Sequence, residues 1–335
     1  MINQIVELAK ELSNERRKDP ELVSRMELAA HGQFPRFLLI SPIDRSSQDL
    51  QLFDMVMGDA FHGTRVPRMP LYPPDKAPFL FGGPAAYNRG FSNERGVILT
   101  FELDEPEAII KDTLDNLVLH PDVKGIPILV FRVDYELGRA RIIPHGKGRN
   151  YEAENYLLGH LRKPDKVDTD TLVLICSDSR VHPPETPSGL PMAILTLAGY
   201  IPRYTGSDDE THQLNEFFSE WLSTSSSSKH ILIVAHGNFE GEGHSCGAAQ
   251  ESLDPTNVKN SFLRYVVSEL QLVATQYENH ILKSAEERAK TISLSIREHL
   301  ISYPAVKEFA DTNPSDFIDI LLMDTISNTL TNADI

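Results

Sequence analysis

The sequence predicts an α/β fold built on a parallel sheet with helices on both faces. In the second half of the chain, short apolar runs that suit strands alternate with longer segments that carry apolar residues at helical spacing. Strands that alternate with helices favour parallel pairing, because each crossover returns the chain to the same edge of the sheet. The strand-like runs are residues 171–176, 192–199, 230–236 and 317–324, and the helical segments are residues 210–222, 258–281 and 285–300.

The first half of the chain predicts a smaller α/β domain without a catalytic motif. Apolar residues at helical spacing fill residues 2–30, and a second helix is expected to begin at Pro20. Residues 62–96 are dense in proline and glycine, which predicts an ordered, packed loop. We therefore expect two domains, residues 1–150 of unknown role and residues 151–335. The other elements expected in the first domain are strands at residues 37–43, 97–103 and 126–135 and a helix at residues 105–119.

Composition excludes several classes of partner. With 48 acidic against 32 basic residues, the chain of 335 residues has a formal net charge of -16. A surface with this excess of acidic residues repels phosphate groups. We therefore expect neither nucleic acid nor an anionic membrane as a partner. The sequence contains no apolar run long enough to span a membrane, and its first residues lack the apolar run of a signal peptide. We expect a cytoplasmic protein.

Both cysteines and one histidine fall where a parallel sheet places its ligands. Cys176 and His236 each end a strand-like run, and Cys246 begins the helical segment CGAAQESL. Ligands bind outside the carboxyl ends of parallel strands, and two thiolates with one imidazole suit zinc. The fourth zinc position would go to water or to Asp178. Taken singly, each residue also suits a structural role, the cysteines as small buried side chains and the histidine as a hydrogen-bonded one.

Several motifs resemble those of β-class carbonic anhydrases. They are Cys-Ser-Asp-Ser-Arg at residues 176–180, Leu-Ala-Gly at residues 197–199, and a strand ending in histidine before a Cys-Gly-Ala helix start. Residues 289–309 are similar to that family's helix before a Pro-Xaa-Val turn, and residues 317–331 are similar to its final strand pair. The resemblance covers about residues 150–335 and implies a β-carbonic-anhydrase-like zinc domain.

The resemblance also implies roles for individual residues. It implies that Cys176, His236 and Cys246 bind zinc. Asp178 and Arg180 would form the family's catalytic dyad, in which the arginine holds the carboxylate off the metal so that it can orient the nucleophile.

The spacing of two ligands departs from the family's usual pattern. Nine residues separate His236 from Cys246, where the family usually has two. The carboxysomal shell branch of the family also has a stretched spacing, which favours His236 as the ligand. The alternative is His244, but it lies so close to Cys246 that a His-Xaa-Cys chelate would have to bend sharply around one metal.

The expected function is reversible hydration of carbon dioxide to bicarbonate by zinc-bound hydroxide. Two alternatives stay open. One is a carbonyl sulfide or carbon disulfide hydrolase, because the same site attacks related linear molecules. The other is a catalytically inactive, zinc-stabilised interaction or shell subunit. The expected partners are the small substrate, further copies of the chain in a homodimer or higher homo-oligomer and, following the carboxysomal resemblance, a protein shell in a bacterial microcompartment.

Overall fold

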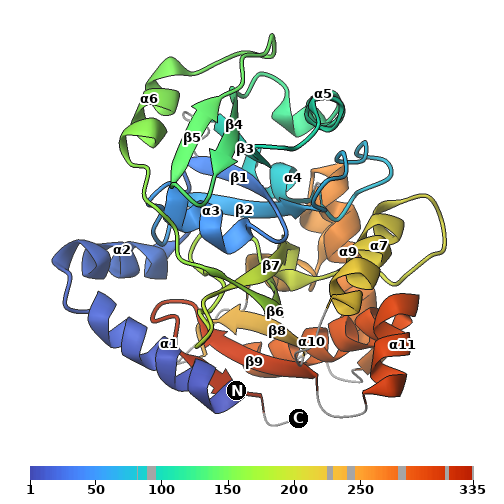
Figure 1. The fold of residues 1–335 in the computed structure, drawn as a ribbon. Helices are drawn as coiled ribbons and strands as arrows, with labels where there is room; N and C mark the ends of the chain where they lie inside the picture. Colours follow the sequence, from blue (N-terminus) through green and yellow to red (C-terminus); the bar gives the residue numbers. More distant parts are fainter. Residues whose placement is uncertain are drawn as a thin grey trace.

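The computed structural model describes residues 1–80, 82–88, 96–224, 229–239, 246–277, 284–313 and 317–333. Within these residues the chain forms two five-stranded, mostly parallel sheets with helices packed on them, which confirms the predicted α/β fold class. Figure 1 shows the first sheet in blue to green above the second sheet, whose strands run from green to red.

The first sheet has the strand order β2-β1-β3-β4-β5. Its first four strands are parallel, and β5 pairs with β4 in the antiparallel direction. The central strands are apolar and buried on both faces, as parallel pairing requires. The elements are β1 (Phe37–Pro42), α3 (Ser46–Leu52), β2 (Ala60–Arg65), α4 (Gly82–Asn88), β3 (Gly96–Glu102), α5 (Glu107–Leu117), β4 (Ile128–Asp134) and β5 (Arg139–Ile142).

The second sheet has the strand order β10-β9-β8-β6-β7. Here too four strands are parallel, and the last strand, β10, is antiparallel to β9. The helix α10 packs on β8 and β9, and α11 packs on α7. The elements are β6 (Val167–Cys176), β7 (Leu190–Thr196), α7 (Glu210–Ser223), β8 (His230–Gly237), α8 (Gly247–Glu251), α9 (Ser261–Tyr277), α10 (Ala285–Ser302), α11 (Pro304–Thr312), β9 (Ile318–Asp324) and β10 (Leu330–Asn332).

Three further helices complete the described fold. At the start of the chain, α1 (Ile2–Arg16) and α2 (Pro20–His31) precede the first sheet in sequence, yet α1 packs against β10 of the second. Between the sheets, α6 (Tyr151–Gly159) buries Ala153 and Leu157 in a core shared with strands of the first sheet. None of the described helices has the length and apolar character needed to cross a membrane.

The sheets meet along a seam where β2 lies beside β7. Backbone hydrogen bonds cross the seam in both directions. Ala193 donates its N–H to the carbonyl of Ile43 at 3.1 Å, and His62 donates its N–H to the carbonyl of Ser177 at 3.1 Å. Because the same hydrophobic core continues from the first sheet into the second, the two halves form one packed body.

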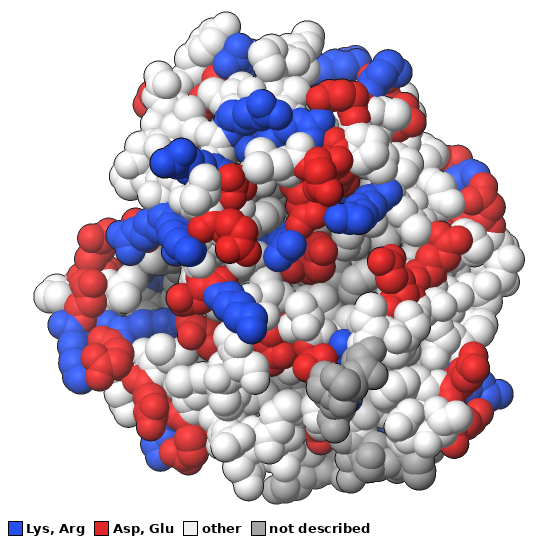
Figure 2. Space-filling view, viewed as in Figure 1, with Lys and Arg blue, Asp and Glu red and all other residues white. Residues whose placement is uncertain are grey.

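The surface is mixed in charge on the face that Figure 2 shows. Basic side chains lie next to acidic ones there, above all over the upper part of the molecule. The ion pairs of the described residues include Arg45 with Glu102 and Lys111 with Asp115. The excess of acidic residues is therefore spread among compensating cations on this face.

Most of the expected elements are confirmed, and the two elements missed within residues 62–96 have separate causes. Within the predicted loop at residues 62–96 the structure contains most of β2 and the whole of α4. The strand was missed because it carries His62, Thr64 and Arg65, polar residues that are buried here because they find partners. The helix was missed because its segment GGPAAYN begins with residues that usually break helices. Strand β5 and the helices α3, α6 and α11 were not predicted either, and residues 81, 89–95 and 225–228 lie outside the described part.

Candidate metal centre

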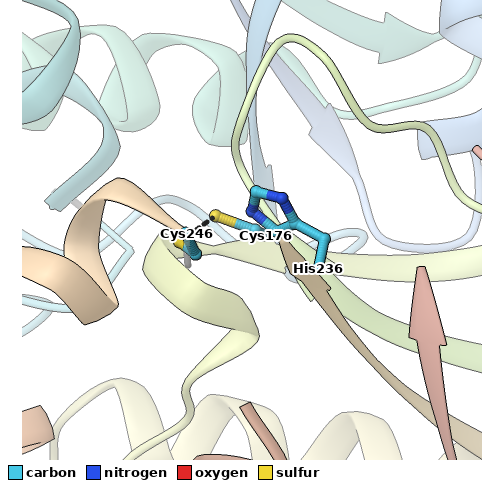
Figure 3. A group of neighbouring side chains, drawn as sticks. All are labelled: Cys176, His236 and Cys246. Carbon is cyan, nitrogen blue, oxygen red and sulfur yellow. Dashed lines mark hydrogen bonds between the residues drawn. The ribbon is translucent and has the colours of Figure 1, made fainter. Parts of the chain in front are cut away.

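The structure brings Cys176, His236 and Cys246 together at the carboxyl edge of the second sheet. Cys176 ends β6, His236 lies near the end of the adjacent strand β8, and Cys246 precedes the first residue of α8. The possible ligand atoms of the three residues all lie within 4.8 Å of one another, and the two sulfurs are 3.4 Å apart (Figure 3). All three side chains are buried. Parallel pairing of β6 with β8 produces this convergence, because it aligns the ends of the two strands.

The imidazole of His236 has one partnered and one unpartnered nitrogen. Its Nδ1 lies 3.0 Å from the hydroxyl oxygen of Thr325, which fixes the orientation of the ring. Its Nε2 is buried and has no hydrogen-bond partner in the described part of the chain. A buried polar atom without a partner costs free energy, and a bound metal ion would remove that cost. The site therefore fits a cation at its centre.

The two cysteines differ in how readily they lose a proton. Burial, together with the neighbouring Cys246, raises the pKa of Cys176 well above its ordinary value. The hydrogen bond with Cys176, opposed by burial and helped by the nearby imidazole of His236, lowers the pKa of Cys246 well below its ordinary value. Two thiolates this close would repel each other in a buried site, so one thiol keeps its proton. A divalent cation would stabilise both thiolates together.

Asp178 lies beside this cluster and is fixed by Arg180. The Arg180 Nε donates to Oδ1 at 2.9 Å, its terminal nitrogen donates to Oδ2 at 2.6 Å, and its backbone N–H donates to Oδ1 at 2.9 Å. Burial alone would raise the pKa of Asp178, but the hydrogen bonds and charge of Arg180, together with His236, outweigh it and lower that pKa. The carboxylate is thus ionised and held 3.8 Å from the Nε2 of His236.

A residue that the sequence analysis missed, Gln33, also contacts Asp178. Gln33 lies between α2 and β1, and its Nε2 donates to Oδ2 of Asp178 at 2.8 Å. Its Oε1 accepts the backbone N–H of Ser179 at 3.4 Å. Nothing in the sequence around Gln33 singles it out, because a lone glutamine in a short connection carries no motif.

The Leu-Ala-Gly motif shapes the other side of the cluster. Ala198 has a positive φ of 58°, and this turn aims its N–H at the Cys176 sulfur, 3.2 Å away. Gly199 follows with a φ of +69°, and a Cβ there would lie 3.3 Å from the backbone of Ile175. The tight turn therefore depends on glycine at this position. Beside the cluster is a cavity of about 10 Å³, lined by Ala198, Ala235, His236, Cys246, Ala249, Ala289 and Ile292.

The alternative ligand His244 lies in residues 240–245, outside the described part of the chain. The choice between His236 and His244 therefore stays a prediction. The structure does place His236 with both cysteines.

Comparison with known proteins gives matches at the level of structure. No protein-family model and no curated protein matches the sequence. Solved β-carbonic anhydrases are similar to the chain over about half its length. One of two tetrameric β-carbonic anhydrases from Sordaria macrospora is 17% identical, with a TM-score of 0.37 over 50% of this chain and 81% of that one. CafA of Aspergillus fumigatus is 23% identical, with a TM-score of 0.36 over 49% and 75% of the two chains. The Coccomyxa enzyme is 16% identical, with a TM-score of 0.35 over 49% and 71%.

Proposed function

We propose that this chain is a zinc-dependent carbonic anhydrase that interconverts carbon dioxide and bicarbonate. The observation that carries the proposal is the buried cluster of Cys176, His236 and Cys246 beside a carboxylate that Arg180 holds in place. Two thiolates and an imidazole are ligands that zinc takes in catalytic sites with an open fourth position. The unpartnered Nε2 of His236 and the short distance between the sulfurs support a cation between them.

When bound, zinc would act as a Lewis acid that lowers the pKa of a coordinated water and so supplies a nucleophile near neutral pH. The residues of the chain have separate tasks around it. Thr325 orients the imidazole of His236 through Nδ1. The N–H of Ala198 stabilises negative charge on the Cys176 sulfur.

Asp178 and Arg180 control where the nucleophile points. A carboxylate is an acceptor only, so Asp178 would accept the O–H of the reacting water and direct its lone pair toward the substrate carbon. Left free, the same carboxylate would take the fourth zinc position itself. Arg180 prevents the carboxylate from rotating toward the metal position, because its guanidinium holds both carboxylate oxygens at once.

The apolar walls beside the cluster suit an uncharged substrate, and the cavity that they enclose has room for no more than about one water. Its volume is about 10 Å³, and side chains of alanine and isoleucine make up most of its lining. Apolar walls of this kind suit carbon dioxide and offer no cation to a phosphate or a carboxylate.

The test is zinc analysis of the full-length protein combined with stopped-flow measurement of carbon dioxide hydration. We expect about one zinc per chain and hydration well above the uncatalysed rate. Zinc-loaded protein that hydrolyses carbonyl sulfide or carbon disulfide but does not hydrate carbon dioxide would replace the proposal with the hydrolase alternative. Zinc-loaded protein that turns over none of these molecules would support an interaction or shell subunit.

A further inference from the structure

The two sheets repeat one topology. In each, the strand order is second, first, third, fourth and fifth when the strands are numbered along their own half of the chain. In each, the first four strands are parallel and the fifth is antiparallel to the fourth. Sheet order and strand direction therefore agree at every position, although the helices between the strands differ in number and length.

The strand registers align the two halves residue by residue. Ile40 of β1 pairs on one side with the second strand of its sheet and on the other with the third, and Ile175 of β6 does the same in the other sheet. When these two isoleucines are matched, the segments around them align without a gap, and Arg45 falls on Arg180. The aligned segments are LLISPIDR at residues 38–45 and VLICSDSR at residues 173–180.

The same alignment shows what the first half has in place of metal ligands. Ser41 occupies the position of Cys176. In the third strand, Phe101 lies two residues beyond the partner of Ile40, as His236 lies two residues beyond the partner of Ile175. A hydroxyl and a phenyl ring are not zinc ligands. The first half therefore has no zinc ligand at either of these two strand positions.

A buried ion pair fills the matching place in the first half. The Arg65 guanidinium packs over the ring of Phe101, 4.4 Å from its centroid. The same guanidinium donates to both carboxylate oxygens of Glu105, at 2.7 and 2.8 Å. Since both side chains are almost completely buried, this pair takes the space next to Phe101 that a ligand cluster would need.

The seam between the halves is close to reciprocal, as an interface between identical subunits related by a two-fold axis would be, and its two crossing hydrogen bonds lie one residue from exact equivalence. The second strand of each half donates a backbone N–H to a carbonyl just beyond the ligand position in the first strand of the other half. Ala193 donates to Ile43, and His62 donates to Ser177. An isologous interface pairs the same patches on both partners in this way.

Through this seam the first half reaches the candidate zinc site. Gln33 precedes β1 of the first half, and its amide nitrogen donates to Oδ2 of Asp178 in the second. Asp178 therefore accepts three hydrogen bonds from Arg180 and one from Gln33.

We infer that the first half is a second copy of the zinc-site half that has lost its ligands, and that it serves as a built-in partner that positions Asp178 through Gln33. The role given to Gln33 rests on the proposed function. The inference of a built-in partner rests on topology, register and the seam alone.

Variants of Gln33 test its positioning role. Gln33→Leu removes the donor, and Gln33→Glu places a second carboxylate against Asp178. A hydrogen bond to a charged group contributes about 1.5–3 kcal/mol, so kcat/KM should fall about tenfold or more in Gln33→Leu, through kcat, with zinc content unchanged. Gln33→Glu should lose more.

Gln51 provides the matched control for these variants. It is also a glutamine of the first half that donates to an aspartate of the second, Asp165, and accepts that residue's backbone N–H. Gln51→Leu should leave kcat/KM unchanged. In cobalt-substituted protein the visible spectrum should shift in both Gln33 variants and stay unchanged in Gln51→Leu, whatever the substrate of the enzyme. Wild-type kinetics and spectrum in Gln33→Leu, or equal losses in Gln33→Leu and Gln51→Leu, would overturn the role of Gln33.

Cutting the chain between the halves tests the built-in partner independently of catalysis and metal. A protease site inserted after Gly146, in an exposed stretch between the sheets, allows the folded full-length protein to be cut. We expect two fragments on a denaturing gel that run as one particle on sizing chromatography. Separation of the fragments under native conditions would show that the first half is an appendage and overturn the inference.

Discussion

At the carboxyl end of β6, two sulfurs and an imidazole converge and leave one buried nitrogen without a partner. At the matching end of β1 a serine hydroxyl and a phenylalanine ring take the equivalent positions, and Arg65 and Glu105 satisfy each other beside them. The two regions share backbone geometry and differ in side-chain chemistry. The comparison teaches that the sheet edge supplies only a position, and that the side chains there decide whether possible metal ligands come together, as they do at Cys176, His236 and Cys246.

The largest expected effect is the loss of zinc when one of the three candidate ligands is replaced. Cys176→Ser, Cys246→Ser and His236→Ala should each reduce zinc from about one per chain to nearly none, because each removes a ligand from a buried site. The matched variants Ser41→Ala and Phe101→Leu should keep their zinc. Elemental analysis of the purified, folded proteins measures this. Zinc retained in His236→Ala would point to His244 instead.

The next effect concerns the ion pair that replaces the ligands in the first half. Glu105→Ala leaves the Arg65 charge buried without a partner, which should lower the free energy of unfolding by about 3–5 kcal/mol. Urea denaturation measures the loss. The double variant Arg65→Met with Glu105→Leu removes both charges and should recover most of the stability. A single variant as stable as the wild type would mean that water reaches the guanidinium.

A smaller effect, on hydration activity, should distinguish Arg180 from Arg45, its counterpart in the first half. Arg180→Ala frees Asp178 to turn onto the metal, so hydration activity should fall on the order of 100-fold while zinc content stays near normal. Arg45→Ala removes the 2.6 Å pair with Glu102 and the contacts with Gln48 and Tyr135, all within the first half, and should leave activity within about twofold. Stopped-flow kinetics with zinc analysis tests both. Full activity in Arg180→Ala would make its pair with Asp178 purely structural.

The last effect is graded with pH and concerns a carboxyl group that joins the halves. Glu210 of α7 accepts the backbone N–H groups of Phe79 and Leu80, and burial raises its pKa from 4.5 to about 8. Folding therefore favours its protonated form, so this group's contribution to stability is present at low pH and is lost as pH rises from about 5 to 8. The slope is at most about 1.4 kcal/mol per pH unit.

Glu210→Gln removes this titration and should flatten the pH dependence. Urea unfolding of the variant and the wild type at pH 5, 6, 7 and 8 gives the difference between their free energies of unfolding. The free energy of unfolding of the variant should increase relative to that of the wild type as pH rises. Two parallel profiles would contradict the raised pKa.

The sequence was most informative where short patterns determine structure. Apolar runs located seven of the ten described strands, in whole or in part, and the Cys-Ser-Asp-Ser-Arg segment placed Asp178 and Arg180 within reach of each other. It was least informative where burial and polarity conflict. In β2, the buried side chains of His62, Thr64 and Arg65 each have a hydrogen-bond partner elsewhere in the chain, and no local pattern reveals those partners.

By itself, the sequence determined the α/β class and the positions of both cysteines at element ends, because hydrophobic periodicity and strand termini are properties of neighbouring residues. Only the tertiary structure revealed that the first half repeats the second and that Gln33 reaches Asp178, 145 residues further along the chain. Such relations depend on strand order and on packing across a seam. The physical reason is that contacts between distant residues arise when the complete core forms, and no single segment encodes them.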